Sequence, residues 1–154
     1  MTDTAAANDA PMDHYFDHGA LSYVQIPATD VRVSAAFYEA IFGWTIRGGS
    51  DTHYSFTDGC GRVIGAWVTG RAIATTAGVL VYIYVHDLDA AVAAVVSHGC
   101  EIVRPRYVEG DVLVATFRDP AGNVIGAWQK APRVVDELSR RVSGSRPARA
   151  AMVR

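Results

Sequence analysis

One short stretch of this 154-residue sequence occurs twice. The segment Gly61–Trp67 reads GRVIGAW, and it returns almost unchanged as Gly122–Trp128, which reads GNVIGAW. Each copy closes a segment that begins with an apolar run ending in an aspartate, Asp30 in the first and Asp87 in the second. A repeat at a fixed distance is typical of a supersecondary unit used twice. Two related units predict paired positions around a shared cleft.

The first unit carries the signals of one strand, one helix and three further strands. Leu21–Ile26 is a β-prone run that ends at Pro27. Asp30 predicts a helix N-cap, apolar residues follow at helical spacing, and Gly43 is a typical stop. The β-prone runs that follow lie near residues 44–47, 53–57 and 62–68.

The second unit repeats this order. Val79–Val85 predicts a strand, and Asp87 and Gly99 bound a predicted helix. The remaining predicted strands lie near residues 101–108, 111–118 and 123–129. We therefore predict an α+β fold with two tandem βαβββ modules, at residues 21–70 and 79–130, in a single domain.

The sequence outside the modules predicts three other segments. Residues 1–20 have little periodicity and predict a flexible N-terminal arm. Apolar spacing predicts a short helix over residues 131–142, which could cover a sheet edge or form a homodimer interface. Residues 143–154 are rich in Ser, Gly, Pro, Ala and Arg without acids, and predict a disordered tail.

Charge and cysteine usage restrict the classes of partner. A net charge of −2 predicts no attraction to nucleic acid or to an anionic membrane. No apolar run reaches the length of a membrane-spanning helix. Cys60 and Cys100 lack the spacing of a metal site, and we interpret both as reduced thiols of a cytoplasmic protein.

Several short motifs give the doubled unit a family resemblance. Ala36-Phe37-Tyr38 and Phe42-Gly43-Trp44 belong to the first predicted helix and its end, and Asp119–Asn123 reads DPAGN before the last strand. Together with the duplication, these motifs resemble the vicinal oxygen chelate superfamily, which includes glyoxalases, bleomycin-resistance proteins and extradiol dioxygenases. The resemblance covers about residues 21–130 and implies that the two modules form an open, eight-stranded, barrel-like cleft.

The resemblance also implies where a metal ion would bind. Metal-dependent members of the family take ligands from the first and last strand of each module. The corresponding positions here are Tyr23, Gly65, Leu80 and Gly126. Glycine and leucine offer no side-chain donor, and an ordinary tyrosine is protonated at neutral pH. A shift in register would add only Gln25, so we expect no metal and no cofactor.

Strand alternation assigns the side chains that would line the cleft. The predicted ligand-binding set is Tyr23, Gln25, Gly65, Trp67, Leu80, Tyr82, Tyr84, Gly126 and Trp128. Aromatic rings with polar groups at their tips suit a flat or conjugated organic ligand, with the paired glycines leaving space between them. The alternative is that these aromatic residues fill an ordinary core.

Three functions remain open at this point. The leading hypothesis is metal-independent binding of a small aromatic or amphipathic molecule, including sequestration of the bleomycin-resistance type. A second is a metal-free isomerase, lyase or cyclase, with Tyr82, Tyr23 or His53 as the acid or base. A third is a divalent-metal enzyme of the glyoxalase type. Charged residues of the later strands, Glu101, Arg104, Arg106 and Arg118, either reach a ligand carboxylate or are simply solvated.

Overall fold

The computed structural model describes residues 15–76 and 78–132. The first module consists of β1 (Tyr23–Pro27), α1 (Val31–Phe42), β2 (Thr45–Ser50), β3 (His53–Thr57) and β4 (Ile64–Val68). The second consists of β5 (Tyr82–Tyr84), α2 (Leu88–Ser97), β6 (Ile102–Glu109), β7 (Val112–Arg118) and β8 (Val124–Lys130). The prediction of an α+β fold with two tandem βαβββ modules is confirmed.

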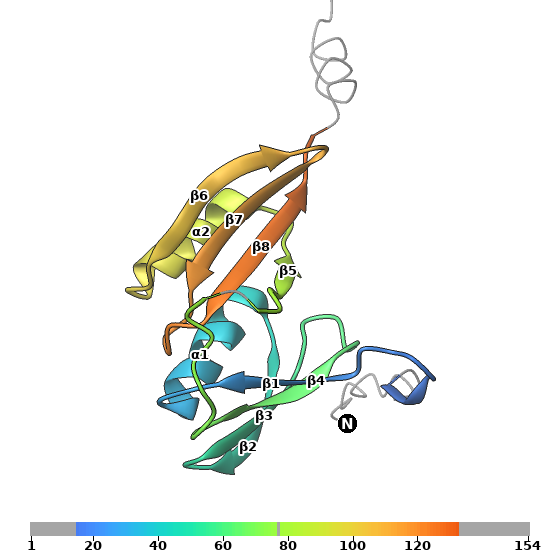
Figure 1. Ribbon diagram of the computed structural model, residues 1–154, viewed down its shortest axis with the longest axis vertical. Coiled ribbons are helices and arrows are strands. Elements are labelled where there is room, and N and C mark those ends of the chain that lie inside the picture. Colours follow the sequence, from blue (N-terminus) through green and yellow to red (C-terminus); the bar gives the residue numbers. More distant parts are fainter. Residues whose placement is uncertain (1–14, 77, 133–154) are drawn as a thin grey trace, which may run out of the picture.

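Each module forms its own four-stranded sheet. Sheet A has the order β1-β4-β3-β2 and sheet B has the order β5-β8-β7-β6. In each sheet the first strand pairs in parallel with the last strand of the same module, and the other pairings are antiparallel. The two sheets lie at opposite ends of the described chain and do not close into a barrel (Figure 1).

The helix starts follow from the local sequence. The Asp30 carboxylate accepts hydrogen bonds from the backbone N–H groups of Arg32 and Val33. The Asp87 carboxylate accepts one from the backbone N–H of Ala90. These bonds satisfy helix N–H groups that have no partner within the helix. At the other end of α1, Gly43 adopts φ 66°, a conformation that favours glycine.

Strand β5 is shorter than predicted. The sequence predicts a strand over Val79–Val85, but regular pairing is limited to Tyr82–Tyr84. This strand is at the edge of sheet B and pairs only with β8. Val79 is 91% exposed, so its side chain gains no packing that would extend the strand.

One core lies between the two sheets and includes α1. Tyr38 stacks on Trp44 in the first module at 4.7 Å between ring centroids. On the other side of the helix, Phe37 and Phe42 pack against Phe117 of β7 at 6.1 and 6.0 Å. Figure 1 shows α1 between sheet B and the strands of sheet A. The helix-bearing faces of both sheets therefore share this core, and the other face of each sheet points away from it. We call these outer surfaces the open faces.

The DPAGN motif connects the modules. The carboxylate of Asp119 accepts the hydroxyl of Tyr38 at 2.9 Å and also accepts backbone N–H groups of its own turn. The side-chain amide of Asn123 donates to the carbonyl of Pro27 at 2.7 Å. The turn between β7 and β8 is thereby tied to α1 and to the end of β1, so this motif has a structural role.

The chain ends differ in part from the prediction. Tyr15 of the predicted arm is held against the first module, because it is buried and its hydroxyl donates to the carbonyl of Gly61 at 2.7 Å, whereas residues 16–20 are exposed. The rest of the predicted arm lies outside the described residues, as do the predicted tail and all but the first two residues of the predicted helix at 131–142. Within residues 15–76 and 78–132, no helix is long and apolar enough to cross a membrane.

Candidate ligand-binding faces

Aromatic side chains gather on the open face of sheet B. Strand register aligns Tyr82 with Gly126, Thr116 and Arg104, and the next row aligns Tyr84 with Trp128, Val114 and Tyr107. Residues in such rows lie side by side on one face of a sheet. We call the set Tyr82, Tyr84, Arg104, Tyr107 and Trp128 the aromatic face.

The rings of the aromatic face remain accessible. Tyr82 is 43% exposed and Tyr84 is 45% exposed. Tyr84 meets the partly buried Trp128 edge to face, with 4.9 Å between ring centroids. Beneath the rings, Val114 and Thr116 are buried. The aromatic rings therefore pack on buried residues on one side and are accessible to solvent on the other.

Gly126 gives the Tyr82 ring a place to lie. A Cβ at position 126 would come within 2.3 Å of the Tyr82 ring. The prediction that Gly126 leaves empty space is wrong, because the ring of Tyr82 already occupies that space. The glycine instead allows the tyrosine to lie flat against β8.

A guanidinium stacks on an aromatic ring in β6, the strand of sheet B that is farthest from β5. The guanidinium carbon of Arg104 lies 3.4 Å from the centroid of the Tyr107 ring, a cation–π contact. The Tyr107 hydroxyl donates to the Glu109 carboxylate at 3.3 Å. Desolvation and the nearby Glu109 charge raise the pKa of Tyr107, so the phenol stays neutral at neutral pH.

In the first module, the glycine and the tryptophan of the repeat face the core instead of the open face. Trp67 is fully buried and packs in the core against Phe56 at 4.6 Å and Tyr38 at 5.4 Å. A Cβ on Gly65 would meet the carbonyl of Val24 at 2.1 Å and the Phe56 ring at 2.4 Å. The prediction that Gly65 and Trp67 line the cleft is therefore wrong.

A one-residue difference in register explains the inversion. Val24 lies opposite Gly65 in sheet A, and Tyr82 lies opposite Gly126 in sheet B. Val24 and Tyr82 are 58 residues apart, whereas the helix caps Asp30 and Asp87 are 57 apart. A shift of one residue moves every side chain of a strand to the opposite face.

The open face of sheet A is mainly polar. Tyr23 is 49% exposed, and Gln25 shares its face as predicted. The side-chain carbonyl of Gln25 accepts a hydrogen bond from the guanidinium of Arg71 at 2.6 Å. His53 Nε2 lies 3.3 Å from Ser55 Oγ. Strand alternation from His53 could have identified Ser55, but Arg71 follows β4 in a loop and carries no sequence signal.

The remaining predicted residues are only partly brought together. Leu80 precedes β5 and therefore has no paired strand position. Tyr23 and His53 share the open face of sheet A, whereas Tyr82 is on the aromatic face of sheet B. The three proposed acid/base residues therefore do not converge within one chain.

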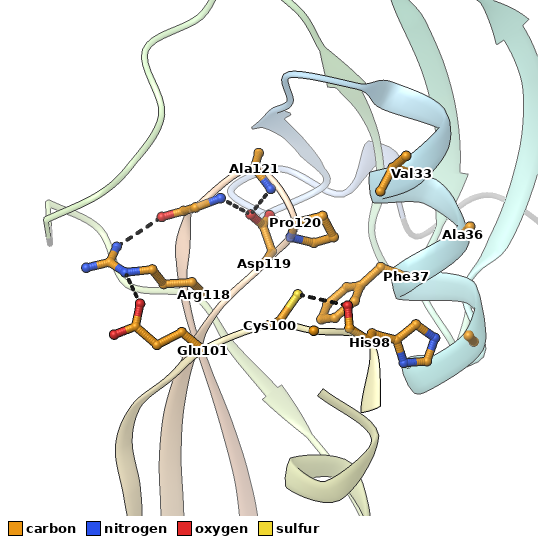
Figure 2. Close-up of a pocket in the computed structure, with 13 residues that line it drawn as sticks. Val33, Ala36, Phe37, His98, Cys100, Glu101, Arg118, Asp119, Pro120 and Ala121 are labelled. Atoms are coloured by element: carbon orange, nitrogen blue, oxygen red, sulfur yellow. Dashed lines mark hydrogen bonds and ion pairs between the residues drawn. The ribbon is translucent and has the colours of Figure 1, made fainter. Parts of the chain in front are cut away.

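Two pockets lie beside the modules, and the first of them is also lined by Tyr82 and Tyr84 of β5. One, of about 780 Å³, is mostly apolar and opens between the outer edges of β1 and β5, with Val24, Phe42 and Ile83 among its lining residues. The other, of about 740 Å³, separates α1 from the turn between β7 and β8 (Figure 2).

The second pocket offers little free polar chemistry. Figure 2 shows Arg118 paired with Glu101, at 3.3 Å, and Asp119 engaged in its own turn. Burial raises the pKa of Cys100, with the Asp119 charge adding to the effect, so this group stays a thiol at neutral pH. These groups support the fold and do not form a reactive site.

Residues 20–126 match the Glyoxalase/Bleomycin resistance protein/Dioxygenase superfamily. The chain belongs to this superfamily. It is 30% identical over 132 residues to CFP32 of Mycobacterium tuberculosis, named as a candidate glyoxylase, with 77% of this chain and 49% of the relative covered. It is 31% identical over 134 residues to the anthracycline biosynthesis protein DnrV of Streptomyces peucetius, with 75% and 48% covered. The chain thus spans about half the length of the curated relatives it matches.

Solved structures share the vicinal oxygen chelate fold. TnmS3, an antibiotic binding protein from Streptomyces sp. CB03234, superimposes with a TM-score of 0.59 at 19% identity, covering 75% of this chain and 98% of that chain. At this identity the likeness shows the fold alone.

Many members of this superfamily use a divalent metal ion, and the residues at the corresponding positions do not fit one. Gly65 and Gly126 have no side chain, and Leu80 has no donor atom. Gln25 is already bonded to the Arg71 guanidinium, whose positive charge opposes a second cation beside it. Within the described ranges, no group of three His, Cys, Asp or Glu residues is assembled.

Proposed function

We propose that this protein binds a planar, conjugated organic molecule on the aromatic face, without a metal. The observation that carries the proposal is the half-exposed pair Tyr82 and Tyr84 beside Trp128, supported by buried residues. Each stacked ring contributes about 0.5–1.5 kcal/mol beyond the area it buries. The names of DnrV and TnmS3 support an antibiotic-like ligand, which this protein would sequester as a bleomycin-resistance protein does.

We further propose that the protein acts as a homodimer. The open faces of sheets A and B point away from the shared core, so neither covers a ligand bound on the other. A second copy that placed its sheet A face over the aromatic face would enclose the ligand and add Tyr23 and Gln25 to the site. A cytoplasmic location is consistent with Cys60 and Cys100, which are free thiols.

The proposed binding is tested with a defined planar probe, neutral anthraquinone-2-carboxamide, titrated into the protein by isothermal titration calorimetry. We expect Trp128→Ala and Tyr82→Ala each to weaken binding about tenfold, since each removes a stacking surface. Val108→Ala is the matched control, because Val108 is exposed on the opposite side of β6. Unchanged affinity in both aromatic variants would disprove the proposed site.

A second candidate function is metal-free acid/base catalysis. It is favoured by the polar contacts on sheet A, where His53 lies beside Ser55 and Gln25 beside Arg71. His53 is exposed and could exchange a proton with a ligand covered by a partner's sheet. Conversion of a bound ligand, followed by mass spectrometry, should be lost in His53→Gln and retained in Ser97→Ala, a control on the surface of α2. Conversion that persists in His53→Gln would remove this candidate.

A further inference from the structure

We propose that Arg104 selects ligands in which the aromatic system carries an anionic oxygen, such as a carboxylate or an ionised phenol. This inference rests on the proposed function, because it concerns the same face. It names the charge of the ligand and the residue that recognises it.

The position of Arg104 is fixed by stacking. Its guanidinium carbon lies 3.4 Å from the centre of the Tyr107 ring, and Tyr107 is itself anchored through its hydroxyl to Glu109. A guanidinium stacked on a ring keeps its N–H donors in its own plane, pointing away from the ring. Arg104 therefore presents donors along the aromatic face while its flat surface is occupied.

Other arginines nearby have their charges occupied. Arg106, two positions along the same strand, pairs with Asp89 of α2 at 3.1 Å. Arg118 pairs with Glu101 and also donates to backbone carbonyls. Among the residues that the structure describes, Arg104 has the ring contact but no hydrogen bond or ion pair to an acid. Its charge is thus available to a ligand.

The spacing suits an extended ring system. Tyr82 and Arg104 occupy the two outer strands of sheet B in one cross-strand row. Three inter-strand spacings give about 14 Å between the backbones of those strands. The Tyr82 ring lies over Gly126 and reaches inward, leaving buried Thr116 between the ring and the arginine. A fused-ring ligand resting on the aromatic face would place an edge oxygen within reach of Arg104, where a charge-assisted hydrogen bond forms.

The test compares two probes of the same shape. Anthraquinone-2-carboxylate and anthraquinone-2-carboxamide differ in charge but not in ring system, and both are titrated by calorimetry into the 154-residue protein. We expect the wild type to prefer the carboxylate about tenfold, which corresponds to about 1.4 kcal/mol. Arg104→Gln should abolish that preference, so that the two probes bind this variant equally. Arg106→Gln, on the same strand but paired with Asp89, should keep it.

The possible results distinguish the role of Arg104 from the proposed binding of a planar ligand on the aromatic face. Equal affinity of the wild type for both probes, or a preference that survives Arg104→Gln, overturns the role of Arg104 and leaves the aromatic site standing. If neither probe binds the wild type, the proposed function and this inference fail together. Loss of the preference in Arg104→Gln alone supports both.

Discussion

Two glycines in identical local sequence have opposite surroundings. Gly65 and Gly126 each stand in the segment VIGAW. A side chain at Gly65 would meet the backbone of Val24 and the buried ring of Phe56, whereas one at Gly126 would meet the half-exposed ring of Tyr82. Backbone and core rings cannot move aside, but an exposed tyrosine can rotate.

This difference predicts separable effects of the same substitution. Gly65→Ala should lower the free energy of unfolding by about 3 kcal/mol or more, because it overpacks the core. Gly126→Ala should cost about 1 kcal/mol or less, but should weaken binding of a planar probe by displacing Tyr82. Urea unfolding and calorimetry measure the two effects. Equal losses of stability would contradict the face assignment.

At the scale of elements, the turn between β7 and β8 ties the two modules together. The Tyr38 hydroxyl and the turn's own N–H groups all donate to Asp119, which is buried. Removing one donor to a buried carboxylate leaves it partly unsatisfied, at a cost of about 1–3 kcal/mol. We expect this loss in Tyr38→Phe, measured by urea unfolding. Because Phe42 also packs in this core without a hydroxyl, Phe42→Leu is a control for packing, and it should leave the pH dependence of stability unchanged.

The same carboxylate predicts a pH dependence. Burial raises the pKa of Asp119, outweighing the opposing hydrogen bonds from Asn123 and Tyr38. Folding therefore favours the protonated form, and this contribution is fully present below the unfolded pKa of about 3.9 and is lost as pH rises through the folded pKa. Relative to Asp119→Asn, the wild type should lose stability as pH rises from about 4 toward 7. A difference that is flat or of opposite sign in denaturant titrations would contradict the direction of this shift.

At the scale of the whole molecule, the proposed homodimer would combine the open face of sheet A from one copy with the aromatic face of sheet B from the other into a single site. We expect light scattering to give a mass twice that of the 16.5 kDa chain. Gln25→Ala and Trp128→Ala homodimers should each bind a planar probe weakly. A heterodimer of the two variants should recover one intact site, because the unmodified sheet A of one copy would cover the unmodified aromatic face of the other. No recovery would indicate that each site is confined to one chain.

Much of the fold could be predicted from sequence because its signals are local. The repeat, the aspartate caps at Asp30 and Asp87 and the stop at Gly43 depend on neighbours in the chain, and the structure confirms them. The aromatic character of Tyr82, Tyr84 and Trp128 was also readable from strand alternation. Arg104 appeared only as one of several charged strand residues, since its stacking on Tyr107 depends on an irregular register in β6.

The sequence by itself determined that a βαβββ unit is used twice and which family it belongs to, since caps, turns and strand periods act over a few residues. Only the tertiary structure decided which way each copy of the repeat faces. Trp67 lies in the core and Trp128 on the open face, although their local sequences match. The physical reason is that a strand's face depends on its register with a partner distant in sequence, and a shift of one residue reverses it.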